Sequence, residues 1–259
     1  MNILVCIKQV PDTKDVRLDP VTNTMAREGV ASIMNPFDRY ALEEAVRIKE
    51  EHGGVITALS MGPPQAAEVL REAISCGADE GVLVSDRAFA GADTWATSYT
   101  LGMAARTLGE FDLILCGKQA IDGDTAQVGP GLACQLKMSY VTCVQKIRTI
   151  ENGSILVERM MDDGYDVVRL PIPSLLTVVK DINEPRVPSL KGKMKAKKAD
   201  IKVLSAQDIT AEEQFIGLAG SPTQVVKVFT PQPRGKRTVF SGTPEEQVSQ
   251  LLKQLKAYL

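Results

Sequence analysis

The sequence contains a single histidine, His52, among 259 residues. Mechanisms that need several histidines, such as proton relays and multi-histidine metal sites, are therefore excluded, and a catalytic triad would depend on this one residue. His52 stands at the polar end of a predicted helix, where we expect no functional role. Paired carboxylates, activated serines and clusters of metal ligands are also missing, so we predict no catalytic residue and no metal site. Any demanding chemistry would come from a bound cofactor.

Paired cysteines and long apolar segments are missing as well. None of the five cysteines belongs to a CxxC motif, and four have apolar neighbours, which is typical of free thiols in a reducing cytosol. No apolar run approaches transmembrane length, and the first eight residues are too short for the apolar part of a signal peptide. We expect a soluble, cytoplasmic protein without membrane insertion. The cysteines are Cys6, Cys76, Cys116, Cys134 and Cys143.

The chain has no excess of positive charge, since its 30 basic and 32 acidic residues give a formal net charge of -2 and a pI of about 5.6. This balance argues against nucleic-acid binding. Basic residues gather only in the stretch 191–198. We interpret this run as a solvated face or a segment that docks on a partner.

Both standard phosphate motifs are absent. No G-x-x-x-x-G-K-[ST] occurs, which excludes a P-loop NTPase. The first predicted strand is followed by Lys8-Gln9-Val10-Pro11 instead of G-x-G-x-x-G, which argues against a standard Rossmann dinucleotide site.

The order of apolar patterns in the first half of the chain predicts an α/β fold. Apolar runs alternate with stretches of helical periodicity, joined by short links, and this alternation is typical of a doubly wound, mainly parallel, Rossmann-like sheet. The predicted strands are 3–7, 55–59, 81–84 and 111–116, and the predicted helices are 39–51, 66–75, 94–108 and 132–136.

The second half predicts an antiparallel extension and a C-terminal arm. Turn signals at 152–153 and 163–164 separate the predicted strands, which are 141–149, 154–160 and 165–170, followed by 174–179. From about Pro188 the composition shifts to Lys, Pro, Gly and Gln, with a final helix over 245–259. We therefore divide the chain into a nucleotide-binding domain, 1–187, and an arm, 188–259, that wraps around a partner or packs on the core.

The stretch 117–130 is the most informative, since it joins a buried strand to a helix through a loop containing Gly117, Gly123 and Gly129. Glycines let backbone N–H groups approach an anion, and a helix N-terminus adds partial positive charge. The loop has two aspartates and one lysine. A phosphate would therefore be held mainly by backbone N–H groups and by Thr125 and Gln127.

Other polar residues follow the predicted strands at the same edge of the sheet, where ligands of open parallel sheets bind. Asn35 could present its amide to a nucleobase or form an Asx-turn, and Asp38 is expected to cap the first helix. Asp93 or Thr94 could cap the third helix. Arg87 could meet a phosphate and Phe89 a ring system, although the residues alone favour plain capping and packing.

Several stretches match one family along nearly the whole chain. They are 34–37 with 41–46, 117–122, 157–164 with 170–173 and Thr177, and 183–186 with 193–198. Through them the chain resembles the beta subunit of electron transfer flavoproteins. Asp166 departs from the family pattern, which favours Glu or Gln there.

The resemblance implies a heterodimer with an alpha subunit and an adenine nucleotide at the strand ends. In most members that nucleotide is a structural AMP, and the redox FAD lies mainly on the alpha subunit. The matching positions are Cys6, Asn35, Pro36, Phe37, Asp38, Met61, Gly117, Lys118, Gln119, Ala120, Ile121, Asp122, Gly123, Asp124, Thr125, Ala126, Gln127 and Val128.

The stretches 85–98, 123–129 and 220–225 are similar to the electron-bifurcating members, in which a second FAD replaces AMP. The resemblance implies that NADH gives this FAD a hydride, as an activity of the complex only. The two electrons then part to a high-potential acceptor, an acyl-CoA or 2-hydroxy-acid dehydrogenase, and to ferredoxin or flavodoxin. The flavin would extend from the 117–129 loop toward a second group of residues: Arg87, Phe89, Asp93, Thr94 and Thr97.

Two other interpretations stay open. The chain could be an ordinary electron transfer flavoprotein beta subunit that holds structural AMP. It could also be a stand-alone nucleotide-binding regulatory domain, although the tail and its basic run look made for a partner.

Overall fold

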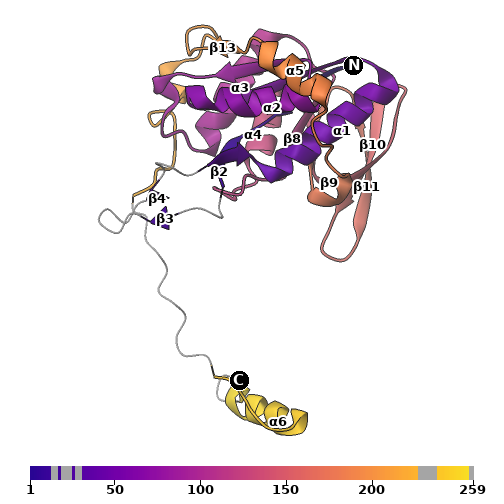
Figure 1. Cartoon of the computed structure of the whole chain (residues 1–259), viewed down its shortest axis with the longest axis vertical. Coiled ribbons are helices and arrows are strands. Elements are labelled where there is room, and N and C mark those ends of the chain that lie inside the picture. The colour runs from indigo at the N-terminus through magenta and orange to yellow at the C-terminus, as the bar shows by residue number, and fades with distance from the viewer. Residues whose placement is uncertain (13–16, 19–24, 27–30, 227–237, 257–259) are drawn as a thin grey trace. The chain divides into compact units, whose positions relative to one another are not determined.

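The computed structural model of this chain describes residues 1–12, 17–18, 25–26, 31–226 and 238–256. The chain divides into two compact units. The first comprises Met1–Leu18 and Met25–Val226 and holds a nine-stranded sheet in the order β11-β10-β9-β12-β8-β1-β6-β7-β13. Figure 1 labels its strands β8, β9, β10, β11 and β13. The second unit includes the C-terminal residues, of which 238–256 are described.

The central strands of the sheet are parallel, as predicted. They are β1 (Asn2–Cys6), β6 (Val55–Met61), β7 (Glu80–Val84), β8 (Leu113–Gly117) and β12 (Ser174–Val178). Nearly all their residues are buried, which explains why they read as continuous apolar runs and not as alternating patterns. Helices on both faces provide this burial.

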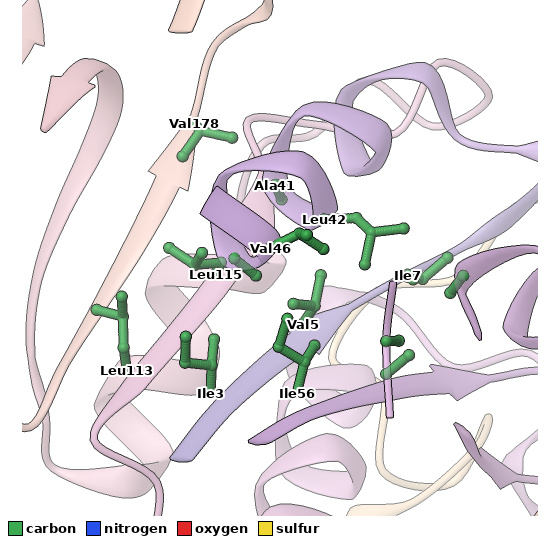
Figure 2. Close-up of a cluster of buried hydrophobic side chains, with 14 of the residues drawn as sticks. Ile3, Val5, Ile7, Ala41, Leu42, Val46, Ile56, Leu113, Leu115 and Val178 are labelled. Atoms are coloured by element: carbon green, nitrogen blue, oxygen red, sulfur yellow. The ribbon is translucent and has the colours of Figure 1, made fainter. Parts of the chain in front are cut away.

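Helices α1 (Pro36–His52) and α2 (Ala67–Cys76) cover one face of the sheet, and α3 (Thr94–Leu108) and α4 (Val128–Leu136) cover the other. Figure 2 shows the first interface, where Leu42 and Val46 of α1 lie over Ile3, Val5 and Ile56. In the second cluster, Leu101 and Leu132 pack on the opposite side of the same strands. The α/β prediction is therefore confirmed.

The antiparallel extension is also confirmed, and it continues the main sheet. Strands β9 (Ser139–Glu151), β10 (Ser154–Met160) and β11 (Tyr165–Pro171) pair antiparallel to one another, and β9 runs parallel to β12. An irregularity in the β9–β12 register lies beside Cys143, whose φ is 58° and whose N–H donates to Thr177 Oγ1 at 3.1 Å. This bulge bends β9 beside the carboxyl end of β12.

Two small pairings were not predicted. Strand β2 (Gln9–Pro11) pairs with β5 (Ser32–Met34), and β3 (Arg17–Leu18) pairs with β4 (Met25–Ala26). The described part of the chain also contains four short 3₁₀ turns: η1 (Pro64–Ala66), η2 (Arg87–Phe89), η3 (Lys180–Ile182) and η4 (Glu213–Phe215).

The compact unit extends past residue 187, where the sequence placed its boundary. Helix α5 (Leu190–Lys198) packs on α2, and β13 (Lys202–Leu204) adds a parallel edge strand beside β7. Three residues of the stretch 188–226 thus join the main sheet, while the division into a domain, 1–187, and an arm, 188–259, stays a prediction. Packing of the arm on a partner stays a prediction.

The second unit contains helix α6 (Pro244–Leu255). A capping box formed by Thr243 and Glu246 fixes its start. Its residues Val248, Leu251, Leu252 and Leu255 recur at helical spacing and are all exposed. Nowhere in the described ranges does a helix combine the length and apolarity needed to cross a membrane.

Candidate functional site

The candidate site lies at the carboxyl ends of β1 and β8, where the sheet changes winding direction. From β1 the chain passes through α1 to β6 on one side, whereas from β8 it passes through α4 to β9 and β12 on the other. Cys6 and Cys116 are register partners at the ends of these two strands. Such a switch point opens a crevice in doubly wound sheets and is their usual ligand site.

Asn35 links the 117–128 loop to the start of α1 by hydrogen bonds. Its Nδ2 donates to the carbonyl oxygen of Gln119 at 2.9 Å, and its Oδ1 accepts from Ile121 N–H at 3.2 Å. The residue is 1% exposed, and its own N–H donates to the Lys8 carbonyl at 2.9 Å. Its amide is therefore committed to the loop backbone, which replaces the base-facing and Asx-turn alternatives raised by the sequence.

The sequence predicted that Asp38 caps α1, and the structure differs. The helix begins at Pro36, and its N-cap residue is Asn35. Asp38 lies in the first turn, buried, and one carboxylate oxygen accepts from Lys8 N–H at 2.7 Å. Burial raises the pKa of Asp38 to about 7, although hydrogen bonds from Lys8 N–H, the Asn35 side chain and Gly117 N–H favour the ionised form. The site thus contains a carboxyl group that titrates near neutrality.

Gly117 is required by the close approach of α1 to β8. A Cβ at this position would collide with Asp38 Oδ1 and would lie 2.6 Å from the carbonyl carbon of Phe37. The loop therefore begins pressed against the first turn of α1. This contact places Phe37 and Asp38 beside the start of the loop.

The loop itself has a constrained backbone. Asp124 and Ala126 both have positive φ values, 52° and 55°, a left-handed conformation that non-glycine residues adopt uncommonly. The Asp124 carboxylate accepts from Gln119 Nε2, and Lys8 Nζ pairs with Asp122 at 2.7 Å. Both loop aspartates are therefore occupied by the protein. The sequence alone indicates only that Lys8 follows the first strand, and the pairing with Asp122 was not predicted.

Several peptide N–H groups of the loop are free to bind an anion. Within the described part of the chain, those of Gly123, Thr125 and Ala126 have no acceptor. Helix α4 follows directly, with no side-chain cap and no acidic residue in its first turn. Exposed Thr125 and Gln127 add side-chain donors. These features fit the pyrophosphate of an adenine dinucleotide or the phosphate of AMP.

The strand ends beneath the loop are apolar and uncharged. Cys6 and Cys116 are buried as free thiols, and Met61 lies half-buried at the end of β6. The neighbouring Cys6 thiol, burial and the charge of Asp38 together hold the pKa of Cys116 well above its usual value. Both thiols are buried and free, as expected, and the role of Cys6 as a nucleotide-binding position stays a prediction. The described residues include no cluster suited to a metal ion.

The second predicted group of residues follows β7, and its members differ in their exposure and contacts. Arg87 is exposed and its guanidinium has no partner among the described residues, so it is available to an anion. Phe89 is 5% exposed and belongs to the second apolar cluster, which makes it a core residue. Asp93 caps α3, and Thr94 and Thr97 lie half-buried in the first turn.

Comparisons with known proteins agree along nearly the whole chain. The profile described as the electron transfer flavoprotein domain matches residues 22–209. The electron transfer flavoprotein subunit beta of Thermoanaerobacterium thermosaccharolyticum is 51% identical over 256 residues, 98% of each chain. The caffeyl-CoA reductase-Etf complex subunit CarD of Acetobacterium woodii is 50% identical over 96% of this chain and 95% of its own. Protein FixA of Azotobacter vinelandii is 48% identical over 92% of this chain and 86% of its own.

Proposed function

Because this chain belongs to the electron transfer flavoprotein family as a beta subunit, we propose that it binds FAD at the β1–β8 switch point and serves in electron bifurcation. The chemistry that FAD would supply there is acceptance of a hydride from NADH and separate release of two electrons. Everything else at the site is binding and positioning by the protein.

The observation that carries the proposal is the row of unpaired N–H groups before α4. Gly123, Thr125 and Ala126 offer peptide donors, and Lys8 is neutralised by Asp122. A pyrophosphate bound here would be stabilised by peptide dipoles and the helix N-terminus. Asn35 would keep these donors in place by holding both Gln119 and Ile121.

The choice of FAD over AMP is supported by the loop after β7. An AMP site needs only the β1–β8 crevice and the 117–128 loop. Arg87 adds an exposed cation, without a partner among the described residues, at the carboxyl end of β7, which is two strands from β1 along the same sheet edge. A dinucleotide extends far enough to use such a cation, either at the flavin or at the bound NADH.

The partners that we propose follow from the family. The alpha subunit would complete an obligate heterodimer, and α6 with its exposed apolar residues belongs to the arm expected to pack on it. An acyl-CoA or 2-hydroxy-acid dehydrogenase would take the high-potential electron, and ferredoxin or flavodoxin the other. The printed name of CarD assigns that relative to a caffeyl-CoA reductase-Etf complex. We place the complex in the cytoplasm.

A count of released cofactors tests this function. The heterodimer is purified and denatured, and FAD and AMP are quantified per dimer by chromatography. Two FAD and no AMP are expected. One FAD with one AMP would refute the bifurcating assignment and support the ordinary, structural-AMP subunit.

The AMP alternative has an observation in its favour. Phe89 is buried, and both carboxylate oxygens of Asp93 are engaged within the chain, so two of the five residues expected to meet the flavin offer it little. The stand-alone alternative is tested by expressing this chain without its partner. A stable, fully folded monomer that retains nucleotide would support it.

A further inference from the structure

A tail segment, residues 216–223, lies against the loop after β7. We call these two stretches the tail segment and the 86–94 loop. A Cβ on Gly217 would collide with the carbonyl oxygen of Ala88 and would lie 3.1 Å from that of Ala90, so the two backbones are in direct contact. Just before the tail segment, the ring of Phe215 lies 5.3 Å from that of Tyr99 in α3. The tail segment is thus packed on the loop over its length.

Asp93 joins the two stretches through one carboxylate oxygen and its peptide N–H, while its other carboxylate oxygen caps α3. One carboxylate oxygen accepts from the N–H groups of Trp95 and Ala96 at 2.9 and 3.1 Å and so caps α3. The other accepts from Thr223 N–H at 3.0 Å and from Thr223 Oγ1 at 2.8 Å. The Asp93 N–H donates to Ser221 Oγ at 2.8 Å. A single side chain therefore fixes both the helix start and the tail segment.

The other end of the loop is held in the same way. One oxygen of Asp86 accepts from Ala88 N–H at 3.0 Å, and the other accepts from Ala206 N–H at 3.1 Å. Burial raises the pKa of Asp93, but hydrogen bonds from Ala96 and Thr223 outweigh it, so the pKa lies below its usual value. Both aspartates are ionised at neutral pH, and neither has an oxygen without a protein donor.

We propose that Asp93 is a positioning residue, which clamps the 86–94 loop to the tail segment through Ser221 and Thr223 and thereby sets the place of Arg87. This revises the expectation that Asp93 itself meets the cofactor. The effect of the clamp on cofactor chemistry rests on the proposed function, because it requires that Arg87 acts on the flavin or NADH. The clamp itself is a property of the chain.

Hydrogen–deuterium exchange of the heterodimer tests the clamp. In Asp93→Asn the amide oxygen can still cap α3, while the NH₂ group cannot accept from Thr223. Exchange should become about tenfold faster together in peptides covering 86–92 and 216–223. Thr223→Val loses only the hydroxyl and should show a smaller, parallel effect, which keeps the test valid if Asp93→Asn folds poorly. Faster exchange confined to 94–97 would overturn the clamp.

Asp112→Asn is the matched control. Asp112 accepts from Asn2 N–H at 2.7 Å at the amino ends of β1 and β8, and no hydrogen bond among the described residues joins it to the 86–94 loop or the tail segment. The substitution likewise replaces a carboxylate that accepts from a backbone N–H. It should leave exchange of residues 86–92 unchanged, and an acceleration there like that of Asp93→Asn would overturn the specificity of the clamp.

A double-mutant cycle with NADH separates positioning from stability. Asp93→Asn should raise the KM for NADH about tenfold with FAD content unchanged, but should have no further effect in an Arg87→Ala background. Additive effects would overturn action through Arg87. If the wild-type site holds AMP, this cycle fails because the site has no flavin for NADH to reduce, whereas the exchange experiment still decides the clamp. Failure of the clamp and of the proposed function are therefore distinguishable.

Discussion

Asp38 makes the stability of this chain depend on pH in a defined direction. Its carboxyl is 6% exposed, and burial raises its pKa from 3.8 to about 7. The folded chain therefore keeps a proton that the unfolded chain has already released at mildly acidic pH. By linkage, the free energy of unfolding falls as the pH rises from 3.8 toward 7, and changes little from this group above that.

The size of the effect follows from the shift. One pKa unit corresponds to about 1.4 kcal/mol, so the full shift of about three units corresponds to about 4 kcal/mol. Between about pH 5.5 and about pH 8.5 only the last unit and a half is traversed, which leaves about 2 kcal/mol. This is a large part of the stability of a typical domain.

The assay is urea unfolding of the nucleotide-free chain at both pH values, followed by the fluorescence of Trp95, the single tryptophan. Removing nucleotide matters because a bound ligand would add its own pH dependence. Wild type should lose about 2 kcal/mol between the two conditions. Asp38→Asn keeps an acceptor for Lys8 N–H, has no ionisable group and should lose none of it.

Asp79→Asn provides a control of opposite sign. Burial acts to raise the pKa of Asp79, but the Lys49 ammonium and the N–H of Ile56 lower it below its usual value. Its titration is complete below the tested range, so this variant should be weaker at both pH values and keep the wild-type difference between them. If Asp38→Asn shows the same pH dependence as wild type, the assignment to Asp38 is refuted.

Three further substitutions examine the loops. Asn35→Ala removes two hydrogen bonds to the loop backbone and should weaken AMP or FAD binding about tenfold. Calorimetry on the nucleotide-free chain measures this affinity, and an unchanged value would contradict the role of Asn35 in holding the loop. Asp124→Leu replaces a left-handed residue bonded to Gln119 with a bulky one and should lower nucleotide content after dialysis, so full retention would show that the loop is misplaced. Arg87→Ala should slow reduction of flavin by NADH about tenfold while leaving FAD content close to wild type, and equal reduction rates in stopped flow would count against Arg87.

The fold could be predicted where a single local pattern decided it. Buried parallel strands gave continuous apolar runs, and the antiparallel strands were separated by turn residues, so their positions agree with β1, β6–β12 to within about two residues. The sequence did not predict strand β13, because its three residues show no periodicity and only Leu204 is buried. Tertiary pairing with β7, not local preference, makes it a strand.

Helix α4 shows a second kind of limit. The sequence placed its start at residue 132, because Gly129, Pro130 and Gly131 read as helix breakers. The structure begins it at Val128. Proline is tolerated in the first turn, and a Cβ at Gly129 would lie 2.5 Å from Thr177 Cγ2. The small residues serve close packing of α4 on β12, which no local pattern reveals.

The sequence predicted where the candidate residues lie in the fold, but not which groups of the protein they contact. Asn35, Asp38 and Asp93 gather at the expected edge, yet each binds the protein's own backbone from a distant part of the chain. A sequence shows a polar residue near a strand end. Whether that residue faces a ligand or another loop depends on contacts 30 to 130 positions away, as for Asp38 with Lys8 and Asp93 with Thr223.

These backbone contacts explain how a loop with two aspartates can serve an anion. Lys8 neutralises Asp122, Gln119 donates to Asp124, and Asn35 holds the loop at Gln119 and Ile121. The carboxylates are thereby used to shape the loop, and the donors left over are peptide N–H groups. Peptide dipoles are fixed by the fold and need no reorganisation when an anion binds, whereas lysine side chains would have to be ordered. We therefore expect the rigidity of the loop, more than its net charge, to determine how well this site would hold a nucleotide.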